Sequence, residues 1–169
     1  MYESPLLDQA AHLIQTAKAG GLKIATAESC TGGLLSGLLT QVAGSSAVFE
    51  RGFVTYSNEA KTAMLGVEKH VIDDHGAVSA AVARAMVLGA LARSPADIAV
   101  AVTGIAGPGG GSETRPVGLV YLACASREGA AVISRQSFGD IGREQVRAAT
   151  LAVALDMLLA ALAQELPRP

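Results

Sequence analysis

The sequence has little cysteine and little charge, and each shortage excludes a class of protein. The two cysteines, Cys30 and Cys124, lie far apart, and neither belongs to a C-x-x-C pair. We therefore expect neither a disulfide-stabilised scaffold nor a cysteine-ligated metal site. Basic and acidic residues nearly balance, at 13 and 15, which gives a formal net charge of -2. Without a basic excess, neither duplex nucleic acid nor an anionic membrane surface is an expected partner.

The sequence also lacks the uninterrupted apolar segments that export or membrane insertion requires. The amino terminus, residues 1–5, has no basic start, and Asp8 breaks the apolar run that follows. Arg84 and Asp156 interrupt the two most apolar stretches, so neither is expected to supply about 20 consecutive apolar residues. These absences favour a protein of the reducing cytoplasm.

Hydrophobic residues, in contrast, are abundant. They make up 50% of the 169 residues, whereas charged residues make up 17%. This balance indicates a large buried core and excludes general disorder. The length is typical of one domain, and no repeat or linker divides it, so residues 1–169 are expected to form a single domain.

The hydrophobic pattern predicts strands that alternate with helices. Helices are expected at residues 5–19, 34–42, 59–65, 80–92 and 143–165, and a short helical connector at 67–75. Strands are expected at 22–27, 49–57, 98–102, 117–126 and 130–138. Ser4, Asn58 and Ser79 are the predicted N-caps. A short loop at residues 127–129 predicts that the last two strands form a hairpin. The order predicts a three-layer α/β/α fold around a mostly parallel mixed sheet with at least one antiparallel strand.

Ser29 is the first candidate for chemistry. It follows the apolar stretch 22–27 and precedes Gly32 and Gly33, where a helix is expected to begin. Backbone N–H groups in such a strand–turn–helix arrangement can stabilise a developing oxyanion, so Ser29 is a candidate nucleophile. An ordinary N-cap serine is the alternative. Cys30 competes for the same role, but no histidine is placed to activate it. The flanking residues lack the glycines of a G-x-S-x-G elbow, which argues against an α/β-hydrolase.

A serine nucleophile needs a base, and Lys61 is a candidate. It is expected in the first turn of a helix, where the helix dipole disfavours a cation and so favours the neutral amine. A surface lysine is the alternative. His12 is expected to face outward, and His70 and His75 lie in a charged segment without the spacing of a zinc helix. We therefore expect no metal site.

The stretch from Thr103 to Ser112 is the richest in glycine and follows a predicted strand. It is not a P-loop, because no G-K-[S/T] follows, and it does not open a helix. Its small residues allow backbone N–H groups to approach a phosphate or carboxylate closely, and a flexible surface loop is the alternative. Arg143, just inside the last predicted helix, could pair with an anion at this stretch or be a surface cation.

Four blocks of the sequence together resemble the carboxy-terminal domain of the competence/damage-inducible protein A family. They run, in the family's order, from Thr26 to Gly33, Gly52 to Lys61, His75 to Ser79 and Thr103 to Pro108. The resemblance covers nearly the whole chain. Stand-alone members of this size look like nicotinamide-nucleotide amidohydrolases, so the resemblance implies conversion of nicotinamide mononucleotide to nicotinic acid mononucleotide and ammonia, in pyridine nucleotide recycling and without a cofactor.

The resemblance also implies roles for individual residues. The family is regarded as a serine/lysine hydrolase, and its nucleophile and base fall on Ser29 and Lys61. Tyr56, Thr103 and Arg143 match positions that look like proton-relay or ligand-binding residues, and we expect Tyr56 to belong to the catalytic group. The remaining substrate-binding positions lie in two turns: Cys30, Thr31, Gly32 and Gly33 in the first, and Gly104, Ala106 and Gly107, beside Thr103, in the second.

One segment departs from the family pattern. Family members often read Gly-Asp-Arg directly before x-x-Val-Arg, whereas here Ile141 and Gly142 separate Gly139-Asp140 from Arg143.

A second hypothesis requires no turnover. The protein would then be a nucleotide-binding or regulatory module linked to competence or DNA damage. The blocks around Ser29 and Lys61 weigh against this reading, because a module without catalysis has no physical need for both. For either function we expect a homo-oligomer, because small apolar residues on the helices at 80–92 and 151–163 leave surface for contact between copies.

Overall fold

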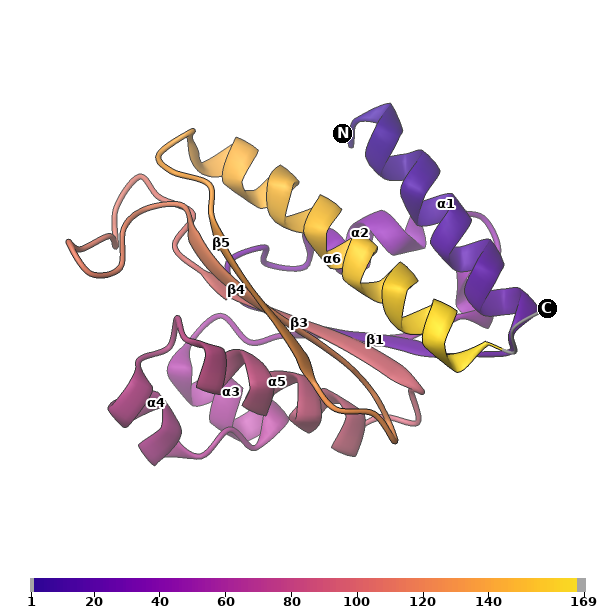
Figure 1. Ribbon diagram of the computed structural model, residues 1–169, viewed down its shortest axis with the longest axis horizontal. Helices are drawn as coiled ribbons and strands as arrows, with labels where there is room; N and C mark the ends of the chain where they lie inside the picture. The colour runs from indigo at the N-terminus through magenta and orange to yellow at the C-terminus, as the bar shows by residue number, and fades with distance from the viewer. Residues whose placement is uncertain (1, 167–169) are drawn as a thin grey trace.

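The computed structural model describes residues 2–166 and shows a five-stranded sheet between two layers of helices (Figure 1). The strands are β1 (Ile24–Glu28), β2 (Phe49–Val54), β3 (Ile98–Gly104), β4 (Leu119–Ser126) and β5 (Val132–Ser137), in the spatial order β2-β1-β3-β4-β5. β1 is parallel to β2 and β3, whereas β4 is antiparallel to both of its neighbours. Among the described strands, β4 alone therefore runs against the others. The predicted fold class and the β4–β5 hairpin are confirmed.

Each face of the sheet is covered by three α-helices (Figure 1). On one face lie α1 (Ser4–Ala19), α2 (Leu34–Thr40) and α6 (Arg143–Glu165), and on the other α3 (Asn58–Leu65), α4 (Lys69–His75) and α5 (Ala80–Ala92). A short 3₁₀ helix, η1 (Ser45–Ala47), precedes β2. One buried cluster of hydrophobic side chains fills the space on each side of the sheet.

Side-chain size differs between the two faces of the central strand β3. Ile98, Val100 and Val102 face the layer of α1, α2 and α6, whereas Ala99 and Ala101 face the layer of α5. Because successive residues of a strand point to opposite faces, this alternation places large side chains on one side and methyl groups on the other. The small side chains allow α5 to pack closely on the sheet.

The carboxyl ends of β1, β2 and β3 meet at one edge of the sheet. Glu28, the last residue of β1, is paired with Val54 of β2 and Val102 of β3. Ligands of open α/β sheets bind at this edge, beyond the ends of parallel strands. The turn after β1, the connection from β2 to α3 and the turn after β3 are therefore neighbours in space.

Two of the three predicted N-caps differ from the structure by one residue. Ser4 is the first residue of α1 rather than its cap, and Glu3 holds the cap position without a side-chain hydrogen bond. In α3 the cap is Ser57 rather than Asn58, because the Ser57 hydroxyl accepts a backbone N–H of the first turn. Ser79 caps α5 as predicted. The strand predicted at 49–57 ends at residue 54, where the chain leaves the sheet towards α3.

α6 begins at Arg143 and ends at Glu165, as predicted. By length and composition alone it could cross a membrane. Asp156 interrupts its most apolar stretch, as noted from the sequence. In the structure its apolar face packs against α1 and the sheet, with Leu155 and Leu158 fully buried. Core helices of globular domains pass the same test.

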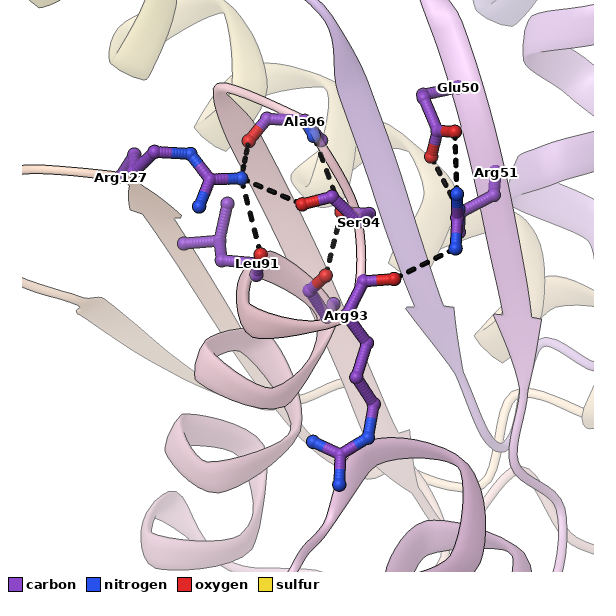
Figure 2. Close-up of polar contacts among 8 residues, drawn as sticks. Glu50, Arg51, Leu91, Arg93, Ser94, Ala96 and Arg127 are labelled. Carbon is purple, nitrogen blue, oxygen red and sulfur yellow. Dashed lines mark hydrogen bonds and ion pairs between the residues drawn. The ribbon is translucent and has the colours of Figure 1, made fainter.

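Two arginines form hydrogen bonds at the carboxyl end of α5 (Figure 2). This region lies at the opposite end of the sheet from Ser29 and Lys61. The Arg127 guanidinium donates to the carbonyl oxygens of Leu91, Ser94 and Ala96, at 3.2, 2.8 and 2.6 Å. Arg51 donates to the Arg93 carbonyl at 2.8 Å. Carbonyl groups in the last turn of a helix, such as that of Leu91, lack partners within the helix. The two arginines supply donors to this turn and to the carbonyls of the segment that follows it.

Candidate active site

Ser29 and Lys61 meet at the carboxyl edge of the sheet. Ser29 follows β1, and Lys61 extends from α3 so that its Nζ lies 3.1 Å from Ser29 Oγ. Both side chains are buried, with exposed fractions of 8% for Ser29 and 2% for Lys61. The alternative reading of Lys61 as a surface lysine was therefore wrong. The N-cap reading of Ser29 was also wrong, because the cap position of α2 belongs to Gly33.

Burial favours the neutral amine of Lys61. It lowers the pKa of Lys61 from its usual 10.5, against smaller opposing effects of Cys30 and Glu59. Besides Ser29 Oγ, the amine has one other hydrogen-bond partner, the Thr55 carbonyl oxygen at 3.0 Å. A neutral amine can donate to this carbonyl and still accept the Ser29 proton, which is the geometry that a general base requires.

Cys30 lies beside the same turn but is held as a thiol. Burial raises the pKa of Cys30 to about 12, so the thiolate is scarcely populated near neutral pH. Its sulfur packs against the end of β3, where a Cβ added to Gly104 would lie 3.1 Å from Sγ. This environment is that of a buried core cysteine and does not favour Cys30 as the nucleophile.

Glu28 is a fully buried carboxylate directly before Ser29. Its Oε2 accepts the backbone N–H groups of Gly33 and Leu35, at 3.1 and 3.0 Å, and its Oε1 accepts the N–H and hydroxyl of Ser36, at 2.8 and 2.7 Å. Glu28 thus caps α2 from the end of β1. Sequence reasoning missed this role, although a lone acid at the end of an apolar strand and just before Gly32-Gly33 was a signal for it.

Within the described residues, two backbone N–H groups of the turn after Ser29 donate to no oxygen atom of the protein. Gly32 donates to the Ser29 carbonyl at 3.0 Å, and Gly33 donates to Glu28. Ser29 itself donates to the Val102 carbonyl at 3.0 Å. The N–H groups of Cys30 and Thr31 remain. Of the four positions predicted to bind substrate in this turn, these two can offer backbone donors.

Two arginines of α6 connect the site's turns. Arg143 donates to the Gly107 carbonyl at 3.0 Å and to the Tyr56 hydroxyl at 2.9 Å. Arg147, one helical turn further on, donates to the Thr31 carbonyl at 2.7 Å. Tyr56 is exposed at the rim. Arg147 was missed by sequence reasoning, although its i, i+4 spacing from Arg143 places both on one helix face.

The second turn is mostly engaged in internal contacts. The Thr103 hydroxyl is buried and donates to the Ala77 carbonyl at 2.7 Å. Ala106 is buried, and Gly107 has a left-handed φ of 82° that favours glycine. The glycines that follow, with Asp140 opposite, line a cavity of about 540 Å³.

A second cavity, of about 680 Å³, lies beside the first turn, and its lining includes Tyr2, Leu34, Arg143 and Arg147. Neither cavity is lined by Ser29 or Lys61. The position of the reactive pair therefore follows from hydrogen-bond geometry rather than from cavity size. Among the described residues, no group of three or more His, Cys, Asp or Glu could hold a metal ion.

Comparison with known proteins identifies relatives along nearly the whole chain. Nicotinamide-nucleotide amidohydrolase PncC of Escherichia coli strain K12 is 49% identical over 159 residues, which cover 94% of this chain and 95% of the relative. A CinA-like protein of Geobacter sulfurreducens is 54% identical over 138 residues, covering 82% of this chain and 33% of that longer protein. The crystal structure of a competence/damage inducible protein of Agrobacterium tumefaciens, CihA, is similar with a TM-score of 0.94 and 52% identity, over 95% of this chain and 98% of the other.

The family match agrees with these relatives. Residues 7–162 match the CinA C-terminal domain. This span includes all six α-helices at least in part and all five strands of the sheet. The chain therefore belongs to the CinA C-terminal domain family.

Proposed function

We propose that this protein hydrolyses the carboxamide of nicotinamide mononucleotide, releasing ammonia and nicotinic acid mononucleotide. The observation that carries the proposal is the 3.1 Å contact between Ser29 Oγ and the buried amine of Lys61. The similarity to a nicotinamide-nucleotide amidohydrolase supports the choice of substrate. In this proposal residues 1–169 act as one domain, in the cytoplasm, in pyridine nucleotide recycling and without a cofactor or metal.

The first step is acylation of Ser29. Neutral Lys61 removes the hydroxyl proton as Ser29 Oγ attacks the carboxamide carbon, and the carbonyl oxygen becomes an oxyanion. The N–H groups of Cys30 and Thr31 are the proposed donors to this oxyanion, because neither donates to a backbone carbonyl of the described residues. In other enzymes one such donor contributes about 2.7–4 kcal/mol to stabilising the transition state.

The second step releases ammonia and then the acid. Protonated Lys61 returns its proton to the leaving nitrogen as the carbon–nitrogen bond breaks, which leaves an ester on Ser29. Water then attacks the ester with Lys61 again acting as the base, and the bond to Ser29 Oγ breaks. The balance is one carboxamide and one water consumed, and one carboxylic acid and one ammonia formed.

Substrate recognition is assigned to the rim of the site. Arg143 donates to both the Gly107 carbonyl and the Tyr56 hydroxyl, and the Tyr56 ring lies beside Gly32 of the first turn. The guanidinium has five N–H donors and can add a phosphate to its present partners. Tyr56 is proposed as a proton-relay residue there. The two turns supply the remaining substrate contacts, through the backbone of Cys30, Thr31, Gly104 and Ala106.

Ammonia release from nicotinamide mononucleotide tests the proposal. Ser29→Ala and Lys61→Ala are each expected to lower kcat/KM at least about 100-fold, because each removes a partner of the proton transfer. Lys69→Ala is the matched control, since Lys69 is an exposed lysine paired with Asp73. Equal activity in all preparations would overturn the mechanism. Tight binding of the mononucleotide by the wild type without ammonia release would favour the regulatory module instead.

A further inference from the structure

We propose that Glu28 is a positioning residue that holds the turn between Ser29 and Gly33 in the shape required to bind the oxyanion. The inference rests on the proposed function, because the turn matters only if Ser29 is acylated. Glu28 touches neither Ser29 Oγ nor Lys61 in the structure. Its role would be exerted through the backbone that carries the N–H groups of Cys30 and Thr31.

The carboxylate of Glu28 accepts hydrogen bonds from the backbone N–H groups at the start of α2. Each of its oxygens accepts two donors, which come from Gly33, Leu35 and Ser36. The negative charge lies at the positive end of the helix, which is the favourable place for it. An anionic group of the substrate therefore has no place at this helix terminus, so the substrate's phosphate must be recognised elsewhere, as assigned above to Arg143.

The same carboxylate also fixes the end of the turn between Ser29 and Gly33. The chain reverses over Ser29 to Gly32, and Gly32 and Gly33 have left-handed φ values of 60° and 95°. One end of this reversal is held by the Ser29 N–H on the Val102 carbonyl, and the other end is held by the Gly33 N–H on Glu28. The segment that carries the N–H groups of Cys30 and Thr31 is therefore held by a hydrogen bond at each end. Preorganised donors of this kind cost no reorganisation when charge develops.

The direction of the Glu28 side chain also keeps it away from the proposed base. The carboxylate of Glu28, at the end of β1, bonds to Ser36 of α2, whereas Ser29, in the turn that follows, lies against Lys61 of α3. The hydrogen bonds of the carboxylate are all to neutral donors. A carboxylate beside Lys61 would favour the cation and prevent it from acting as a base. Glu28 thus holds the start of α2 and the turn without a hydrogen bond to the lysine.

The test is the variant Glu28→Gln. Its kcat is divided by the number of sites that bind the product, nicotinic acid mononucleotide, so that only folded sites are counted. Glutamine has the same size, but its NH₂ group cannot accept hydrogen bonds, so some of the four hydrogen bonds to this side chain are lost. We expect kcat per binding site to fall about 10- to 100-fold, with KM and the product Kd within about twofold and the pH midpoint of activity unchanged. Asp97→Asn is the matched control, because Asp97 accepts the Lys23 N–H at the opposite end of β1. It should keep the wild-type kcat.

The outcome separates a positioning role from a structural one. A structural role would lower the melting temperature and the number of binding sites but leave kcat per site unchanged, and that result would overturn the proposal. If Glu28→Gln yields no binding sites, Ser36→Ala carries the test, since it removes one of four donors and keeps the charge. A twofold to tenfold lower kcat per site at constant Kd is then expected, and a wild-type kcat would overturn the proposal. A wild type that releases no ammonia refutes the proposed function instead.

Discussion

Lys61 combines full burial with a hydrogen bond to a hydroxyl, and the two properties depend on each other. The side chain spans the interior from α3 and ends between Ser29 Oγ and the Thr55 carbonyl. A buried cation without an acidic partner is costly, so the interior favours the uncharged amine. The surroundings of Lys61 therefore favour an uncharged amine beside the Ser29 hydroxyl.

This environment predicts the pH dependence of activity. Because burial lowers the pKa of Lys61 below 10.5, the amine is neutral at pH values where a surface lysine is still charged. Activity is expected to fall as the pH falls through this lowered pKa, since protonation removes the base. A profile of kcat/KM against pH reports the free enzyme and should show an acidic limb with its midpoint below 10.5. A midpoint at or above that value would contradict the assignment of Lys61 as the base.

At the level of secondary structure, α3 and α5 decide where the lysine sits. Gly89 of α5 packs against Leu65 at the end of α3, and a Cβ at Gly89 would clash with the Leu65 backbone carbonyl. The contact sets the distance between the two helices. Because α3 carries Lys61, this packing also sets the reach of the amine towards Ser29.

Gly89→Ala is therefore expected to lower both stability and activity. The added methyl group has to push α3 away, and overpacking of this kind typically costs about 1–3 kcal/mol. The displaced Lys61 should lower kcat more than it raises KM. Chemical unfolding and ammonia release measure the two effects. Gly109→Ala is the control, because a Cβ at Gly109 meets no atom within 4 Å. Wild-type stability of Gly89→Ala would show that the helices can separate without cost.

For the whole molecule, we predict a homo-oligomer. The small residues of α5 pack mainly on the sheet and on α3, so this helix offers little surface for contact between copies. Large apolar side chains remain exposed on the surface, among them Val54, Met64, Leu88 and Val132. Burial of such side chains between copies is favourable. Light scattering of the purified protein is expected to give at least twice the mass of one chain, and a monomer at all concentrations would contradict the prediction.

Local patterns determined the elements of this protein. In α1 the apolar residues that recur at helical spacing are buried, namely Leu6, Ala10, Leu13, Ile14 and Ala17. The bounds of α6 and α5 and the cap at Ser79 also followed from neighbouring residues, because helix formation and capping act within a few positions of the chain. The N-caps predicted at Ser4 and Asn58 were each wrong by one residue, because neighbouring residues can take the same cap position.

Only the tertiary structure decided the state of the site. Lys61 and Ser29 are 32 positions apart, and Arg147 and Thr31 are 116 apart, so neither contact is encoded in a local pattern. The sequence alone left Lys61 open to a surface reading and did not assign the buried carboxylate of Glu28. Burial and the pairing of backbone N–H groups depend on what the rest of the chain places around a residue. Folding therefore determines which donors are occupied, which are free and whether the lysine is neutral.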